Sequence, residues 1–164
     1  MCAADADEVR SIAARALIDG IASPPAGIAL HFAAGEPVHP RALVALDDAA
    51  PESIREAASA ALVALGYPAT EIAFAAIGAE VGPESLRLAV ETLDPEVIVT
   101  LSDAAHRVIV AALAAGEREA DGVTSQAGRR IVAIGEFAAA LEDESAKRAA
   151  WERFKLAGVR GPAY

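Results

Sequence analysis

Acidic side chains that follow predicted strands are the residues best placed to do chemistry in this chain. Asp47 and Asp48 come directly after the apolar run 42–46, and Glu136 follows the run 129–134. A carboxylate at a strand end can bind a metal ion, activate a water molecule or transfer a proton. The alternative is structural, because aspartate before a proline such as Pro51 is typical of a turn or a helix cap. Asp48 and Glu136 are the candidate catalytic residues.

The three histidines offer weaker candidates. His31 and His39 flank a predicted hairpin and could converge with Asp48, although their spacing is not that of a metal site. Asp103 and His106 are three residues apart on one predicted helix face, which suits a metal ion, a proton relay or a local pair beside a helix cap. Ordinary strand, loop and capping roles are the competing interpretation for all of them.

Two kinds of bound group are excluded by the composition and the motifs. The chain has one cysteine, Cys2, so it can form neither an intrachain disulfide nor a four-cysteine zinc site or iron–sulfur cluster. It contains no glycine-rich phosphate motif, neither G-x-G-x-x-G nor G-K-[ST]. We therefore predict that the protein uses no metal and no cofactor.

The predicted elements place the strand-end residues at one edge of a sheet. Residues 27–33 and 42–46 are expected to be two strands joined as a hairpin, and a helix is expected between Pro51 and Gly66. Further strands are expected at 71–77, 96–101 and 129–134, further helices at 83–93, 103–115 and 137–157, and a loop at 117–128. This alternation predicts an α/β fold, a three-layer sandwich around a central, mostly parallel sheet. Sites in such sheets lie at the carboxyl ends of the strands.

Length and charge limit the domain count and the partners. With 164 residues, 54% of them hydrophobic, we expect an N-terminal helical arm (1–25), one α/β domain (26–158) and a tail (159–164). The arm carries a predicted amphipathic helix at 5–21, which would dock a partner or pack on the domain. A formal charge of −10 opposes binding to nucleic acid and favours a protein partner or a small ligand.

The hydropathy pattern gives an expectation for location. No run of about 18 apolar residues exists, so no segment is expected to span a membrane. The first ten residues are acidic and lack the basic and apolar regions of a signal peptide. A cytoplasmic location is the expectation that follows.

Two segments resemble the uracil-DNA glycosylase superfamily. Residues 93–105 (LDPEVIVTLSDAA) are similar to a strand and turn of that family, and residues 129–155 (RRIVAIGEFAAALEDESAKRAAWERFK) resemble its last strand, motif loop and closing helix. With these anchors, residues 41–51 (RALVALDDAAP) match its first catalytic strand and loop. The resemblance covers residues 40–157 and implies a uracil-DNA glycosylase-like fold.

The resemblance also implies roles for the matched positions. The family everts a damaged base into a pocket and uses an acidic residue near the attacking water, an asparagine that reads the base, and a histidine that stabilises the leaving anion. Asp48 matches the acidic position. The asparagine position matches Ala75 or Ala76, and the chain contains no asparagine at all.

The remaining matched positions carry the wrong charge for base excision. The histidine of the last motif is matched by Glu136-Phe137, which puts a carboxylate where an anion would need stabilisation. A glycine that favours phosphate is matched by Ser102, and Asp103 follows it. The resemblance therefore implies that the scaffold is kept and that the base-excision activity is lost.

A second resemblance gives the expected function. The order of elements and the Trp-bearing closing segment 147–154 (KRAAWERF) are similar to psi subunits of the bacterial clamp-loader assembly. This implies a non-catalytic accessory protein that binds replication or repair proteins through its arm and one face of the sheet. Two alternatives stay open: a divergent DNA glycosylase that uses Asp48 with Glu136 on a modified base, and a small-ligand-binding protein with a pocket at the strand ends.

Overall fold

The computed structural model describes residues 28–32, 40–115 and 122–159. The predicted helix 5–21, the arm that carries it and His39 lie outside this part of the chain, as does all of the predicted tail except Val159. Within the described ranges, no helix is long and apolar enough to cross a membrane.

A six-stranded sheet forms the middle of the molecule, with the strand order β1-β3-β2-β4-β6-β5. The strands are β1 (Ile28–Phe32), β2 (Ala42–Asp47), β3 (Ile72–Ile77), β4 (Val97–Thr100), β5 (Val123–Gln126) and β6 (Arg129–Ala133). The four central strands run parallel, while β1 and β5 pair antiparallel at the two edges. The prediction of a mostly parallel sheet is confirmed.

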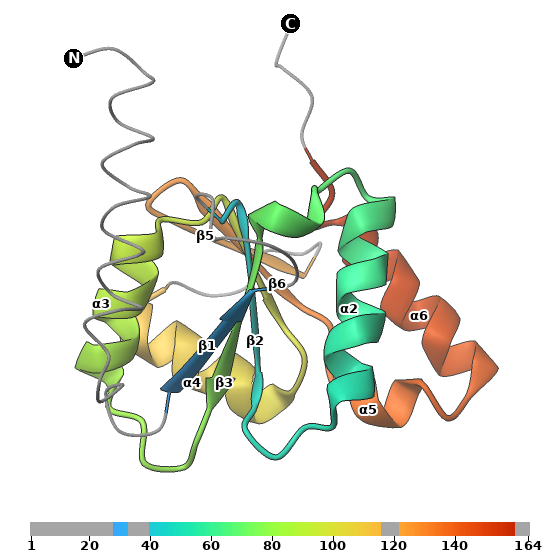
Figure 1. The fold of residues 1–164 in the computed structure, drawn as a ribbon, viewed down its shortest axis with the longest axis horizontal. Helices are drawn as coiled ribbons and strands as arrows, with labels where there is room; N and C mark the ends of the chain where they lie inside the picture. The colour runs from blue at the N-terminus through green and yellow to red at the C-terminus, as the bar shows by residue number, and fades with distance from the viewer. Residues whose placement is uncertain (1–27, 33–39, 116–121, 160–164) are drawn as a thin grey trace, which may run out of the picture.

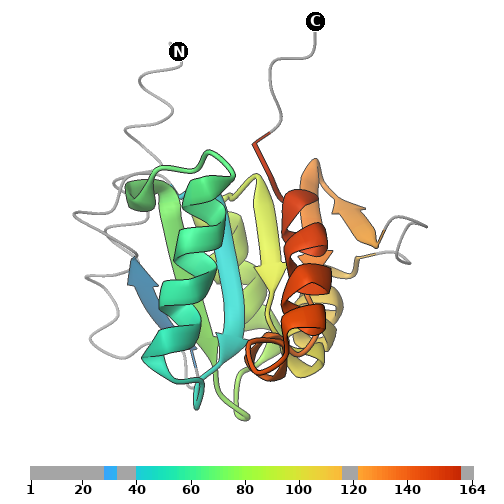
Figure 2. The same ribbon diagram turned by 90° about the vertical axis from the view of Figure 1, so that its right-hand side faces the viewer.

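Helices cover both faces of the sheet. One face carries α2 (Glu52–Ala64), α5 (Phe137–Ala140) and α6 (Glu144–Lys155); the other carries α3 (Pro83–Leu93) and α4 (Asp103–Leu113) (Figure 1, Figure 2). A 3₁₀ turn, η1 (Ala69–Glu71), leads into β3. The three layers enclose two separate apolar clusters, one on each side of the sheet. The predicted three-layer α/β architecture is thus present.

The alternation of side chains along the strands explains why their sequences read as continuous apolar runs. In β2, Val44 and Leu46 belong to the cluster under α2 and α6, whereas Leu43 and Ala45 belong to the cluster under α3 and α4. Successive side chains point to opposite faces, and both faces are covered, so apolar residues are favoured at consecutive positions.

The predicted hairpin of residues 27–33 and 42–46 is wrong, although both strands exist. β1 pairs with β3, with Ile28 opposite Ile77, and not with β2. The reason lies in the sheet order, because β2 has β3 on one side and β4 on the other. It therefore has no free edge for β1, which instead pairs with the open side of β3.

The predicted loop 117–128 is also wrong in its second half, which forms β5. Val123 and Thr124 are buried there, and β5 folds back on β6 through Ala127 and Gly128. Both turn residues have positive φ, 49° and 82°, as a two-residue hairpin turn with a right-handed twist requires. The polar composition of this segment reflects its place at the edge of the sheet.

The predicted single helix 137–157 is broken into α5 and α6. Asp143 starts α6, because its side chain accepts a hydrogen bond from the Ala146 amide at 2.7 Å. Phe154 is buried and makes an edge-to-face contact with Phe137, with 5.2 Å between ring centroids. Trp151, three residues before Phe154 on the same helix, is 39% exposed.

Candidate functional site

The carboxyl ends of β2, β4 and β6 bring the predicted site residues to one edge of the sheet. Asp47 and Asp48 end β2, Ser102 and Asp103 follow β4, and Glu136 follows β6. β2 and β4 are neighbours, and the helices that follow them leave toward opposite faces of the sheet. Such a divergence opens a crevice at the strand ends, where α/β proteins place their ligands.

Ser102 links β2 to the start of α4. Its Oγ accepts a hydrogen bond from the Ala105 amide at 3.0 Å, so it is the N-cap of the helix. The same hydroxyl donates to Asp47 Oδ1 at 3.1 Å. Ser102 is buried, and both contacts fix its orientation. The helix cap expected at the start of this helix is therefore Ser102, and Asp103 is the first residue of α4.

Glu136 reaches across to the same helix end. Its Oε1 accepts a hydrogen bond from the Asp103 amide at 2.9 Å. The amides of a helix N-terminus are where a protein ordinarily binds a phosphate or another anion, because they point outward and the helix dipole is positive there. In this protein a carboxylate of the chain itself occupies that position.

A glycine turn holds the Glu136 loop in place. Gly135 has a φ of +87°, and a Cβ at this residue would lie 2.9 Å from Nη1 of Arg153. That guanidinium donates to the Ile134 carbonyl at 2.6 Å, and the Phe137 amide donates to the Leu101 carbonyl at 3.0 Å. Only glycine fits this turn without strain. The loop therefore has a defined path beside β4.

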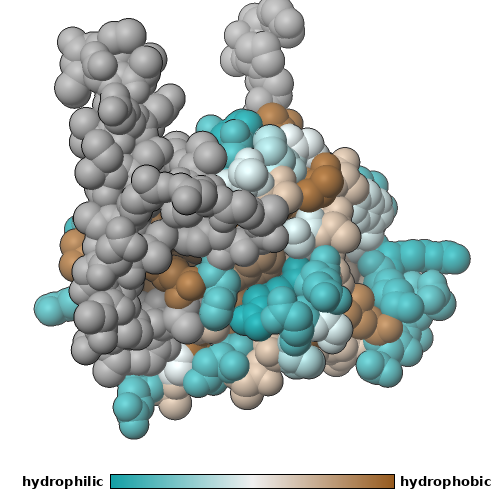
Figure 3. All heavy atoms as spheres, viewed as in Figure 1, coloured by the Kyte–Doolittle hydropathy of each residue, from teal (hydrophilic) through white to brown (hydrophobic). Residues whose placement is uncertain are grey.

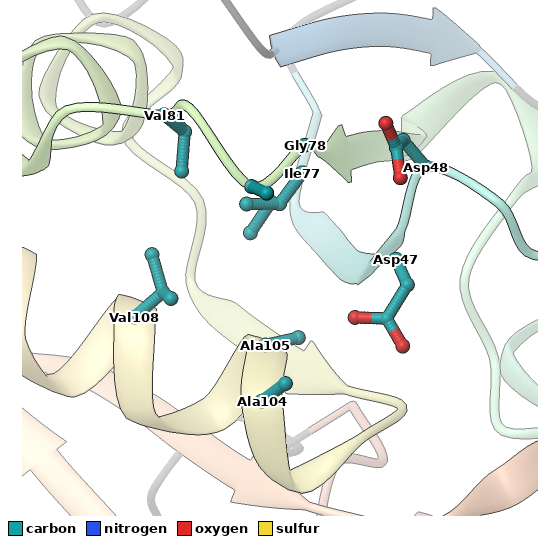
Figure 4. Close-up of a pocket in the computed structure, with 9 residues that line it drawn as sticks. Asp47, Asp48, Ile77, Gly78, Val81, Ala104, Ala105 and Val108 are labelled. Carbon is teal, nitrogen blue, oxygen red and sulfur yellow. The ribbon is translucent and has the colours of Figure 1, made fainter.

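A pocket of about 310 Å³ opens beside Asp47 and Asp48. Ile77 and Gly78 at the end of β3 and Ala105 in the first turn of α4 line it as well (Figure 4). The Asp48 amide donates to the Ile77 carbonyl at 3.2 Å, which holds the turn after β2 against the end of β3. Asp48 thus lines a surface pocket, as a ligand-binding or catalytic role would require.

The histidines do not join this site in the described part of the chain. His106 lies 3.1 Å from the Thr100 hydroxyl through its Nδ1, and Thr100 is fully buried in β4. His31 sits on edge strand β1 opposite Phe74. No group of three His, Cys, Asp or Glu side chains among the described residues could hold a metal ion.

The electrostatic effect of His31 falls on the start of α2. A hydrogen bond from Arg55 lowers the pKa of Glu52 below its usual value, and the nearby charge of His31 adds a smaller effect in the same direction. Glu52 is an exposed residue in the first turn of α2. This is a surface charge pair and not a catalytic arrangement.

The positions at which the sequence resembles glycosylase motifs lie at the same ends of the parallel strands. Asp48, Asp103 and Glu136 are three carboxylates at one edge of the sheet. Ala75 and Ala76, which the resemblance aligns with an asparagine, are buried in β3 and offer no side-chain hydrogen bond.

The amino-terminal end of the parallel strands, opposite the candidate site, contains polar residues that sequence analysis missed. Arg130, at the start of β6, donates to the carbonyls of Leu156 at 2.7 Å and Gly158 at 3.0 Å. Tyr67 donates to the Ala157 carbonyl at 2.6 Å. Burial raises the pKa of Tyr67 above its ordinary value, while the charge of Arg130 partly opposes that rise. The sequence signal that could have identified Arg130 is an arginine within a predicted strand whose following residues are apolar.

Two more arginines lie at this end of the strands. Arg41 forms a two-pronged contact with Glu96, with distances of 2.9 and 3.0 Å, and its guanidinium carbon lies 5.7 Å from the centre of the Tyr67 ring. Arg129 pairs with Asp94 at 2.8 Å. These contacts join the beginnings of strands to neighbouring turns and helix ends, so their role is structural.

Comparison with known proteins leaves the geometry as the guide to function. No model of a known protein family matches the chain, and no curated protein matches it either.

Proposed function

We propose that this protein is a non-catalytic accessory protein with a glycosylase-like scaffold, which binds protein partners in DNA replication or repair. The observation that carries the proposal is the hydrogen bond from the Asp103 amide to Glu136 Oε1 at 2.9 Å. A carboxylate fills the helix N-terminus at which a departing base anion or a DNA phosphate would have to bind.

The size of the electrostatic effect supports a loss of activity. A base leaves its sugar as an anion, and a carboxylate about 4 Å from that anion raises its energy by roughly 4 kcal/mol at an effective dielectric constant near 20. Such a penalty slows the reaction by about a thousandfold. Asp48 could still orient a water molecule, but Glu136 would oppose the step that follows.

The overall charge argues against DNA as the partner. The chain carries −10 formal charges, and its strand-end edge presents Asp47, Asp48, Asp103 and Glu136. Proteins that bind nucleic acid need a positive surface that releases counterions from the phosphates. An acidic edge instead favours contact with a basic protein surface.

The outer surface of α6 offers a contact for a partner. Both faces of the sheet carry helices, so a partner would contact helices and not a face of the sheet as the psi resemblance implied. Trp151 is 39% exposed on α6, whose outer surface is otherwise mostly hydrophilic at the right of Figure 3. Exposed tryptophan is among the residues that contribute most to protein interfaces.

The test is affinity purification with chemical cross-linking from the native host, followed by mass spectrometry. We expect reproducible recovery of clamp-loader or repair subunits, and a clear loss of them with Trp151→Ala. Leu88→Ala, which truncates an exposed apolar side chain on the other side of the sheet, is the matched control. Reproducible absence of such subunits from the cross-linked material contradicts the proposal.

A divergent glycosylase is the second candidate, because Asp48 lines a pocket of about 310 Å³. Oligonucleotides that contain uracil, hypoxanthine or xanthine would lose a base if this candidate is correct, and Asp48→Asn would abolish the release. The third candidate, a small-ligand-binding protein, uses the same pocket and would show as thermal stabilisation in a metabolite screen.

A further inference from the structure

The pocket beside Asp47 and Asp48 has two chemically different sides. Figure 4 shows the aliphatic side chains of Val81, Ile77 and Val108 on one side and the two carboxylates on the other. The aliphatic residues come from β3, from the turn before α3 and from α4, so three separate elements build this wall. A ligand that fits must therefore combine a hydrocarbon part with a polar group.

The carboxylates of Asp47 and Asp48 can still accept hydrogen bonds from that polar group. In the described part of the chain, the Asp48 side chain makes no hydrogen bond or ion pair. Asp47 Oδ1 accepts one hydrogen bond from the Ser102 hydroxyl. Both aspartates are exposed at the mouth of the pocket, so they can meet a ligand from solvent.

The sign of the local charge decides which polar group fits. The N-termini of α3 and α4 face this edge, and each is equivalent to roughly half a positive charge. Two of the amide donors at the start of α4 are already used, since Ser102 accepts from Ala105 and Glu136 accepts from Asp103. Asp47 and Asp48 add two full negative charges, so the pocket favours a cation.

We propose that this pocket binds an alkylammonium or alkylguanidinium group, with the hydrocarbon part against Val81, Ile77 and Val108 and the cationic head at Asp47 and Asp48. A volume of about 310 Å³ suits a short aliphatic amine or a single basic side chain. A bare metal ion suits it less, because Ca²⁺ or Mg²⁺ requires about six oxygen ligands and the described lining offers two carboxylates. The proposal does not depend on the accessory role, since a free amine can bind without any partner.

The direct test is a titration of the full chain, followed by nuclear magnetic resonance of the backbone amides. The probe is pentylamine, and pentanol and pentanoate are its neutral and anionic counterparts of equal length. We expect pentylamine to shift the amide signals of Gly78, Ala79 and Ala105 in a saturable way. Its affinity should be at least about fivefold higher than that of pentanol. Shifts spread over the whole surface, or equal binding of the three probes, would overturn the proposal.

Three variants locate the site. Asp48→Asn should weaken pentylamine binding about three- to fivefold. Ala104→Leu, which fills the pocket from an exposed helix position, should abolish binding while the thermal melt shows a folded protein. Glu84→Gln removes a charge of the same sign from the first turn of α3, outside the lining, and should leave binding unchanged. Undiminished binding in folded Ala104→Leu contradicts the assignment.

A second pair of probes identifies the source of the cation. Agmatine represents a free metabolite, and arginine blocked at both backbone ends represents the side chain of a partner protein. Binding of both supports a partner's basic side chain as a ligand, and binding of agmatine alone supports a small metabolite. Binding of neither, together with no response to pentylamine, would refute the site while leaving the accessory role to its own cross-linking test.

Discussion

The two ends of the parallel strands differ in whether their charged side chains have partners within the protein. At the edge where the parallel strands begin, Arg41, Arg129 and Arg130 contact carboxylates and main-chain carbonyls within the protein. At the edge where the strands end, Asp48 and Glu136 make no ion pair with other described residues. Where the strands begin, the polar groups stabilise the fold through contacts within the protein. Where the strands end, the carboxylates remain free to bind other molecules.

This difference separates stability from function in the molecule. Removing a buried cation leaves its acceptors unsatisfied, which is costly. Removing an exposed carboxylate relieves repulsion or changes little. Substitutions where the strands begin should therefore cost much more stability than comparable substitutions where the strands end.

The largest effect is expected for Arg130→Met. This change leaves the carbonyls of Leu156 and Gly158 without their donor and should lower the free energy of unfolding by about 3 kcal/mol. Urea denaturation followed by circular dichroism measures it. Arg107→Met, on an exposed position of α4, is the matched control and should cost less than about 0.5 kcal/mol. Equal effects of the two substitutions would show that the network at Arg130 contributes nothing.

The next effect concerns Tyr67 and depends on pH. Tyr67→Phe removes the hydrogen bond to Ala157 and should cost about 1 kcal/mol at neutral pH. Because burial raises the pKa of Tyr67 in the folded protein, its contribution is fully present below the unfolded value near 10 and is lost as pH rises through the higher folded value.

Urea denaturation from pH 8 to pH 11 tests this sign. The wild type should lose more stability above about pH 10 than Tyr67→Phe, so that the difference between them narrows. A difference that stays constant or widens across this range would show that the phenol is not protonated in a buried site.

A smaller effect is expected at the opposite edge for Glu136→Gln. The amide keeps an oxygen acceptor for Asp103 but removes the charge at the start of α4, which should cost about 0.5 kcal/mol. The difference should shrink when stability is measured in high salt, because exposed charges are screened. A loss above about 2 kcal/mol would place Glu136 in the structural class of Arg130.

The smallest effect is expected for Asp48→Asn. The side chain has no partner in the described part of the chain and lies next to Asp47, so stability should change by less than about 0.5 kcal/mol, with a gain the favoured direction. Thermal melts of the two proteins in parallel measure it. A marked loss of stability would assign Asp48 to a structural role and remove it from the candidate site.

Local patterns predicted most of the elements, because each depends on neighbours in the sequence. The helix after Pro51, the helix that begins at Pro83 and the buried strand of 97–100 all agree with their caps and periodicity. The placement of Asp48, Ser102 and Glu136 at one end of the sheet also followed from the predicted parallel direction of the strands, since the carboxyl ends of parallel strands meet there.

Features that depend on partners distant in sequence were not predictable in the same way. Whether β1 pairs with β2 or β3 depends on which strand edge is free, and no local pattern encodes that choice. Arg130 was missed because its acceptors, at 156 and 158, are provided by the end of a helix 26 and 28 residues away. The hydrogen bond between Glu136 and Asp103 likewise joins two loops that only the fold brings together.

The most direct test of the central claim is a base-release assay on the purified full chain. Single- and double-stranded oligonucleotides with uracil, hypoxanthine or xanthine are incubated with the protein, and abasic sites are detected by alkaline cleavage. With Glu136 at the start of α4, we predict no release above the protein-free control. Release that persists through purification and disappears in Asp48→Asn would contradict the account and establish the protein as an enzyme.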